Sequence, residues 1–178
     1  MKELDASKWG EYAVGNLFEI RPTKAYKMTN AELMDDGQSP VVVNSAYNNG
    51  IGGKSSKETT EKGNMITFSD TVDANTIYYQ PDDFIGYPHV QGLYPIGEYA
   101  NKWSRESLLF FVSSFRKAAL VKGFDYGNKF RRDIAVTLKV KLPKDSFNNP
   151  DWSFMEQYIK TIEEKVSKSL DKLQDIIK

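Results

Sequence analysis

Cysteine is absent from this chain of 178 residues, and histidine occurs once. Without cysteine there is no disulfide framework and no thiolate nucleophile, and one imidazole leaves too few ligands for a transition-metal site. The chain also has no apolar run of about 18 residues and no signal peptide with a basic start and an apolar stretch. These absences predict a cytoplasmic protein that does not enter a membrane.

Motifs of common enzyme classes are missing as well. There is no phosphate-binding Gly-x-x-x-x-Gly-Lys-Ser/Thr loop, no Gly-x-Ser-x-Gly and no Asn/Asp-Pro-Pro-Tyr/Phe methyltransferase motif. His89 follows a proline and precedes a valine, which is more typical of a structural than of a catalytic histidine. The acids Asp70, Asp73, Asp82 and Asp83 can in principle hold a divalent cation, but no acid-x-Lys element follows them, and we interpret them as a solvated loop. The sequence therefore predicts a non-catalytic protein that binds no metal and no cofactor of its own.

Charge is present in equal amounts of both signs, with 24 basic and 24 acidic residues, but it is segregated along the chain. Residues 58–100 hold seven acids against one lysine, and residues 101–144 hold eleven basic residues against three acids, an excess of eight. Such a segment can build one positive face that phosphate groups attract. The alternative is that the two segments pair with each other in the fold.

The pattern of elements indicates an α+β fold for residues 1–148. The runs "PVVV", "NMITFSD" and "ANTIYYQ" are β-rich, whereas "NKWSRESLLFFVSSFRKAAL" has a helical stripe with Ser104 as a candidate N-cap. Further on, Val136, Leu138, Val140 and Leu142 alternate with lysines and predict a last strand. We expect an irregular, twisted or barrel-like sheet with short helices, and aromatic residues, 13% of the chain, supply its core.

Residues 149–178 predict one long C-terminal helix of the coiled-coil type. Asn149 is a candidate cap, and Pro150 suits the first helical position. A heptad-like seam follows, formed by Met155, Ile159, Ile162, Val166, Leu173 and Ile176. A helix of about 28 residues is about 42 Å long, whereas a body of this size is about 30 Å across. We therefore expect its far half to extend beyond the body and to pair with another helix.

Amide and basic side chains in glycine-rich loops are the candidate DNA contacts. Asn and Gln read adenine edges in the major groove, Arg reads guanine, and Lys or Arg bind phosphate. On residue type and loop position these candidates are Asn48, Asn49, Lys54, Arg105, Asn128, Lys129, Arg131 and Arg132.

Five sequence blocks carry a resemblance to a known family. They are "WGEYAVGNLFEI", the Asn-Asn-Gly-Ile hairpin, "NMITFSD", "FDYGNKFRRDIAVTLKVKLP" and "PDWSFMEQYIKTIEEK". Together they resemble a target recognition domain, with its conserved helix, of a type I restriction–modification specificity subunit. The last two blocks are also similar to recognition domains of fused type II restriction–modification enzymes.

This resemblance implies a specificity protein that reads one half of a split double-stranded DNA site. A modification subunit would methylate adenine there with S-adenosylmethionine, and a restriction subunit would join the complex. Specificity subunits of this family carry two recognition domains, each followed by a long helix, whereas this sequence holds one of each. We therefore expect a half-size form that pairs as a homodimer through its terminal helix.

Two alternatives stay open at this point. The chain can be the recognition domain of a fused type II restriction–methylation enzyme. It can also be a carbohydrate- or protein-binding module that uses its aromatic residues as a platform.

Overall fold

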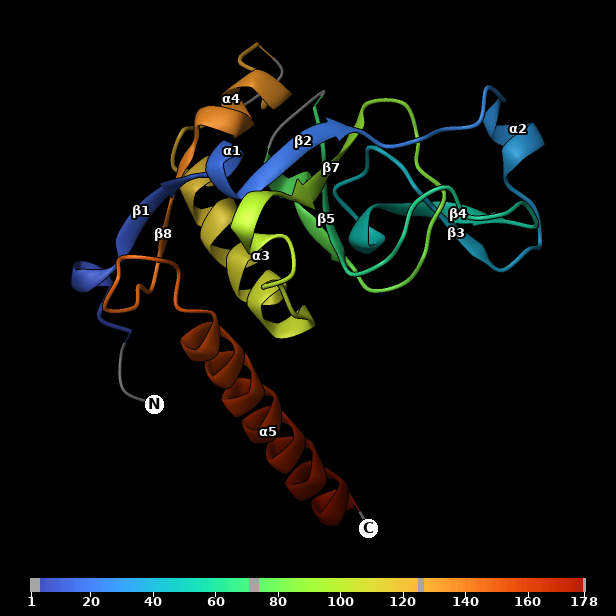
Figure 1. The fold of residues 1–178 in the computed structure, drawn as a ribbon. Coiled ribbons are helices and arrows are strands. Elements are labelled where there is room, and N and C mark those ends of the chain that lie inside the picture. Colours follow the sequence, from blue (N-terminus) through green and yellow to red (C-terminus); the bar gives the residue numbers. More distant parts are fainter. Residues whose placement is uncertain (1–3, 71–73, 125–126, 178) are drawn as a thin grey trace.

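The structure is a computed structural model that describes residues 4–70, 74–124 and 127–177 (Figure 1). The strands are β1 (Gly10–Ala13), β2 (Phe18–Pro22), β3 (Ser39–Val42), β4 (Ile51–Ser55), β5 (Met65–Ser69), β6 (Tyr78–Gln80), β7 (Val90–Pro95) and β8 (Lys139–Leu142). The α-helices are α1 (Val14–Leu17), α2 (Asn30–Leu33), α3 (Arg105–Leu120), α4 (Arg132–Thr137) and α5 (Trp152–Ile177). Short 3-10 turns are η1 (Ala6–Lys8), η2 (Asn48–Gly50), η3 (Ala74–Thr76) and η4 (Gly97–Tyr99).

The strands form three open antiparallel sheets. The central sheet has the order β2-β7-β5-β6, and two-stranded sheets are formed by β1 with β8 and by β3 with β4. The β1–β8 sheet joins the two ends of the body, since Gly10 is opposite Leu142 and Ala13 is opposite Lys139. The α+β class of the sequence prediction is confirmed, and its irregular sheet takes the form of these separate pieces.

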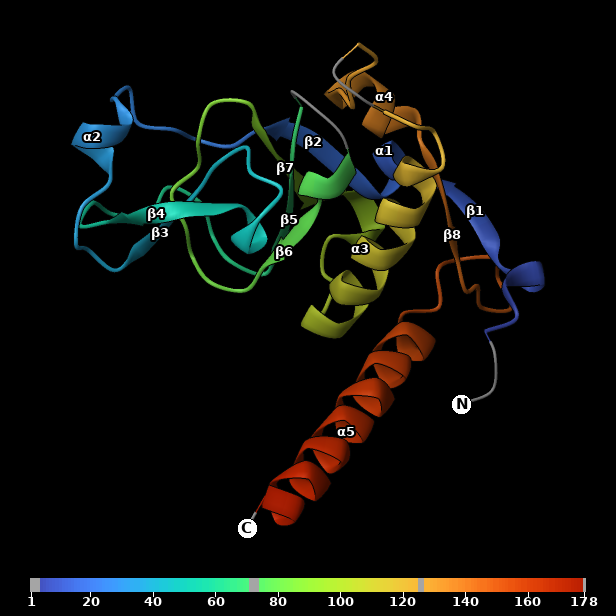
Figure 2. The same cartoon turned by 180° about the vertical axis from the view of Figure 1, so that it is seen from behind.

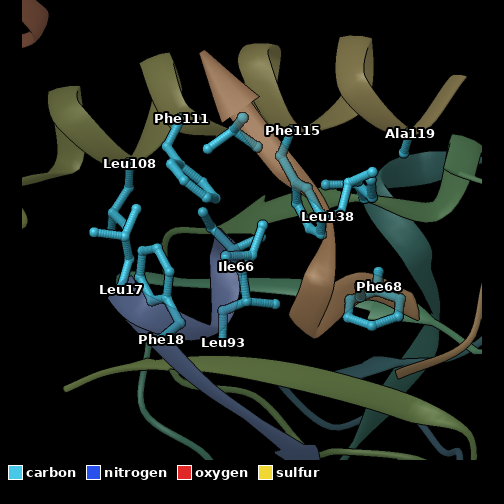
Figure 3. Packing of buried hydrophobic residues seen from close by; sticks show 14 of the residues in the cluster. Leu17, Phe18, Ile66, Phe68, Leu93, Leu108, Phe111, Phe115, Ala119 and Leu138 are labelled. Carbon is cyan, nitrogen blue, oxygen red and sulfur yellow. The ribbon is translucent and has the colours of Figure 1, made fainter. Parts of the chain in front are cut away.

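Helix α3 covers the central sheet and forms the core with it (Figure 3). Leu108, Phe111 and Phe115 point from α3 toward Phe18 and Ile66 of the sheet, and all five side chains are at most 2% exposed. The predicted cap of this helix is confirmed, because the Ser104 hydroxyl accepts a hydrogen bond from the Ser107 amide at 3.3 Å. This aromatic layer forms the main contact between α3 and the central sheet.

The predicted last strand is wrong at its start. Val136 lies in α4 rather than in a strand, and the strand β8 begins only at Lys139. Val136 packs over Gly15 of α1, where a β-carbon on the glycine would lie 2.6 Å from the valine side chain. The apolar alternation of Val136 and Leu138 is too short to distinguish a strand from a helix. Packing of α4 against α1 decides in favour of the helix.

The start of α5 also differs from the prediction. Asp151 caps the helix, since its Oδ1 accepts a hydrogen bond from the Phe154 amide at 2.9 Å. Asn149 instead closes the preceding loop by donating its backbone N–H to Asp145 Oδ1 at 2.9 Å, and Pro150 forms a β-bridge with Lys144. The helix accordingly begins at Trp152, and the proposed domain boundary at residue 148 stays a prediction.

Helix α5 leaves the body after its first turns (Figures 1 and 2). Met155 is fully buried in the core of its own body, and Trp152 packs on Trp103 with ring centroids 5.9 Å apart. From residue 163 to residue 175 every side chain is exposed. The predicted seam is therefore divided between an anchored base and a projecting part.

Candidate nucleic-acid interface

The asparagine-rich loop between β3 and β4 holds two of the predicted DNA contacts. Asn48 donates its side-chain amide to the Ile51 carbonyl at 3.1 Å. Asn49 donates to the Tyr79 carbonyl at 2.9 Å and to Gln80 Oε1 at 3.2 Å. These amides donate within the protein and build the loop itself, and Asn48 and Asn49 stay predicted DNA contacts.

Lys54 lies near the end of β4, exposed and opposite Pro40 of β3. It projects from the small β3–β4 sheet, which both ribbon views place at the far end of the body from β1 and β8 (Figures 1 and 2). A cation at this position is available to a phosphate group, and Lys54 stays a predicted contact.

Arg105 has a structural role that the sequence did not predict. It is the first residue of α3, and its Nη1 lies 2.7 Å from Glu163 of α5 and 3.2 Å from Glu106. The hydrogen bond to Glu163 raises the pKa of the Arg105 guanidinium further above its usual value. Because this half-exposed ion pair links α3 to α5, we interpret Arg105 as a residue that helps to orient α5.

The remaining predicted contacts lie just before α4 or at its first residue. Asn128 and Lys129 lead into the buried Phe130, while Arg131 and Arg132 are exposed. Arg131 holds Asp133 in a bidentate pair of 3.2 and 3.0 Å, which lowers the pKa of the Asp133 carboxyl. Arg132 is consequently the stronger candidate of the two for phosphate, since the charge of Arg131 is already matched.

A groove of about 820 Å³ lies beside this segment. It is lined by lysines from α3, from the turn after it and from β8, by Glu11 and by apolar side chains. The lysines are Lys117, Lys122, Lys139 and Lys141, and the apolar side chains include Trp9, Ala118, Val121, Phe124, Ile134 and Leu138. Four of the eleven basic residues of the segment 101–144 therefore line one groove.

Sequence reasoning missed Lys139 and Lys141 as functional candidates. Both are exposed on β8, while Val140 and Leu142 between and after them are fully buried. The alternation of these lysines with apolar residues could have indicated them, because a strand puts alternate residues on the same face. The alternation was used only to predict the strand.

The acidic residues form no comparable site within the described part of the chain. Asp70 accepts a hydrogen bond from Gln91 at 2.9 Å and lies 3.5 Å from His89, whereas Asp83 pairs with Lys62 at 2.7 Å. Asp73 lies outside the described residues. Among residues 4–70, 74–124 and 127–177 no three acids or histidines come together as metal ligands. No helix in the same ranges is long and apolar enough to cross a membrane.

Comparison with known proteins gives the class of this fold. Residues 6–172 match the family model of the type I restriction modification DNA specificity domain. The match covers nearly the whole chain, from η1 to the last turns of α5. The chain therefore belongs to this family, and the resemblance drawn from the sequence blocks is confirmed.

Individual relatives agree with this assignment. The chain is 27% identical over 169 residues to the specificity subunit S.BcgI of the type II restriction enzyme BgcI from Heyndrickxia coagulans. It superposes on the S subunit of a type I restriction-modification system from M. genitalium with a TM-score of 0.60 at 15% identity, covering 96% of this chain and 44% of that one. The HsdS subunit from Thermoanaerobacter tengcongensis gives a TM-score of 0.54 at 12% identity, with 97% and 41% coverage. At these identities the two structures support the fold alone.

The length of these matches is itself informative. The alignment covers 93% of this chain but only 47% of the specificity subunit S.BcgI. The chain thus spans about half the length of the relatives that it matches. Within this span the chain holds one α+β body and the long helix α5.

Proposed function

We propose that this chain reads one half of an interrupted double-stranded DNA site and directs an adenine methyltransferase to it. The membership of residues 6–172 in the DNA specificity domain family carries this proposal. The chain itself contributes no catalytic group and binds no cofactor. S-adenosylmethionine would be bound by a separate modification subunit, and a restriction subunit would join the same complex.

The projecting part of α5 supports the spacing role in this proposal. The whole of α5, with 26 residues, spans about 39 Å at 1.5 Å per residue. Val166, Leu170 and Leu173 expose 53–55% of their surface on its projecting part, which is unusual for large apolar side chains unless a partner covers them. We propose that a second copy of the chain covers them, so that two recognition bodies lie at opposite ends of a helix pair.

A two-fold arrangement has a consequence for the DNA. Two identical bodies related by a two-fold axis read the same half-site on opposite strands, so the target is a palindrome. The helix pair sets the separation of the half-sites. An interrupted palindrome is therefore the expected target.

Methylation mapping tests the proposed function directly. The chain is expressed with the modification subunit encoded beside it, in a host without other adenine methylation, and modified adenines are located by sequencing. We expect methylation at one interrupted palindrome only when this chain is present. An asymmetric chain-dependent site would contradict the homodimer, and no chain-dependent methylation beside an active modification subunit would contradict the specificity role.

The lysines of β8 provide a second prediction. In the complex, Lys139→Gln/Lys141→Gln should weaken binding to all duplexes alike, because these side chains would contact phosphates rather than bases. The slope of log K against log salt should fall by about 2, since each phosphate contact contributes about 0.9. Fluorescence anisotropy on a duplex at several salt concentrations measures both quantities.

The matched control removes two lysines from the projecting helix. Lys165→Gln/Lys172→Gln changes the net charge equally but lies on the exposed part of α5, away from β8. We expect this control to keep the wild-type salt slope. Equal slopes for both double variants would exclude β8 from the DNA interface.

A further inference from the structure

Tyr47 is presented to solvent at the tip of the asparagine-rich loop. Its side chain is 82% exposed, although tyrosine is a residue that normally buries much of its ring. It directly precedes η2, in the connection between β3 and β4. A ring displayed in this way gains nothing from the fold of its own body.

The backbone that carries Tyr47 is held from both sides. The Tyr47 amide donates to the Ser45 hydroxyl at 3.1 Å, and the Tyr47 carbonyl accepts from the Gly50 amide at 2.9 Å. The Val43 amide donates to the Gly50 carbonyl at 2.8 Å and closes the base of the loop. Tyr47 therefore sits on a closed turn.

The asparagines after Tyr47 add a second set of constraints. Asn48, Asn49 and Gly50 have φ angles of 50°, 53° and 78°, three successive left-handed residues. Such conformations are costly for residues other than glycine and persist where side-chain bonds determine them. Here Asn49 donates to β6, and Gln80 of β6 donates back to the Asn49 carbonyl at 3.1 Å. The strain is held in place by bonds to the central sheet, and its effect is to fix the position of the loop tip.

Aromatic and basic side chains lie behind the loop. A β-carbon on Gly50 would be 3.4 Å from the ring of Tyr78, and the guanidinium of Arg116 lies 5.7 Å from the centroid of that ring. A cation of α3 is thus positioned near the base of the loop, where it can attract a DNA phosphate. The tip itself offers a ring rather than a charge.

We infer that Tyr47 is a specificity-determining residue that stacks on a base of the target site. This inference rests on the proposed function. Aromatic rings stack on exposed bases and, as wedges, enter steps between base pairs that unstack easily. Because the loop is already ordered, little conformational entropy is lost when it contacts DNA. The free energy of stacking by the ring therefore contributes to affinity almost in full. Asn48 and Asn49 act through Tyr47 as positioning residues, which accounts for the use of their amides within the loop.

The experiment uses the complex with the modification subunit and the site found by methylation mapping. Tyr47→Ala should lower affinity for the target duplex by about 10- to 100-fold. Affinity for an unrelated duplex, which lacks a readily unstacked step at that position, should stay unchanged. Tyr47→Phe should retain wild-type affinity, because the ring and not the hydroxyl makes the contact. Target duplexes with 2-aminopurine at each adenine in turn should show one position whose fluorescence changes on binding wild type and Tyr47→Phe but not Tyr47→Ala.

Phe147→Ala is the matched control, because Phe147 is also 82% exposed but lies in the loop before α5. It should leave DNA affinity and the 2-aminopurine signal unchanged. Wild-type discrimination by Tyr47→Ala, an equal loss on both duplexes, or an equal loss for Tyr47→Phe would each overturn the inference. If the wild-type complex itself does not discriminate between the duplexes, the proposed function fails instead, so the two failures are distinct.

Discussion

Phe111→Ala is expected to lower the free energy of unfolding by about 3–5 kcal/mol, the largest stability loss that we predict for a single substitution. Phe111 is fully buried, and its ring packs against Phe18 at 4.9 Å, Trp103 at 5.4 Å and Phe115 at 5.7 Å between centroids. Removing it leaves a cavity between α3 and the sheet that large neighbours cannot fill without leaving their own contacts. Since domains of this size are stable by about 5–15 kcal/mol, much of the native population can be lost.

Urea unfolding followed by circular dichroism measures this effect, at one protein concentration because association would change the midpoint. Phe147→Ala is the matched control, since it makes the same change at an 82% exposed ring. We expect this control to stay within about 0.5 kcal/mol of wild type. Similar losses for the two variants would mean that the layer in Figure 3 is not the stabilising core.

Leu170→Glu/Leu173→Glu is expected to convert the proposed dimer into a monomer. The two leucines are exposed on the projecting part of α5 and lie three residues apart on one face of the helix. In a helix pair they would be covered, and two carboxylates in that apolar seam would be buried without partners. The dissociation constant should rise by at least about 100-fold, and light scattering should give the 20.3 kDa of one chain instead of twice that mass.

The control makes the same change of net charge elsewhere on the helix. Lys168→Gln/Lys172→Gln shifts the net charge by the same two units at exposed positions that lie at least 100° round the helix from Leu170 and Leu173. This control should remain a dimer, with the helical content of both variants unchanged. A wild-type chain that is monomeric at every concentration, or two double variants that dissociate alike, would contradict pairing through α5.

A helix pair of this kind uses less of the heptad-like seam than the sequence predicted. Met155 is taken into the core of its own body, and Ile159 and Ile162 are partly buried, whereas Val166 and Leu173 are exposed. The side chain of Ile176 lies outside the described residues. We therefore propose that pairing begins beyond Ile162. The base of α5 anchors the helix to its own body.

Local features were determined by the sequence alone. The Ser104 cap, the buried and exposed alternation of β8 and the long final helix all follow from spacing and residue type within a few neighbours. The excess of basic residues after position 100 was also visible in the sequence, and four lysines among them line the groove beside α3 and β8. The family resemblance could also be found from the sequence, because the blocks that carry it are short and contiguous.

Other features were decided only by the tertiary structure, because the local sequence was compatible with more than one element or partner. Val136 joined α4 because Gly15 lets it approach α1, and Arg105 formed an ion pair with Glu163, which is distant in the sequence. The amide of Asn49 was committed to β6, which left Tyr47 as the exposed group of its loop. Periodicity and residue type indicate which face of an element is apolar and which side chain can donate a hydrogen bond. The residues that cover that face or accept that hydrogen bond are distant in the sequence, and only folding brings them into contact.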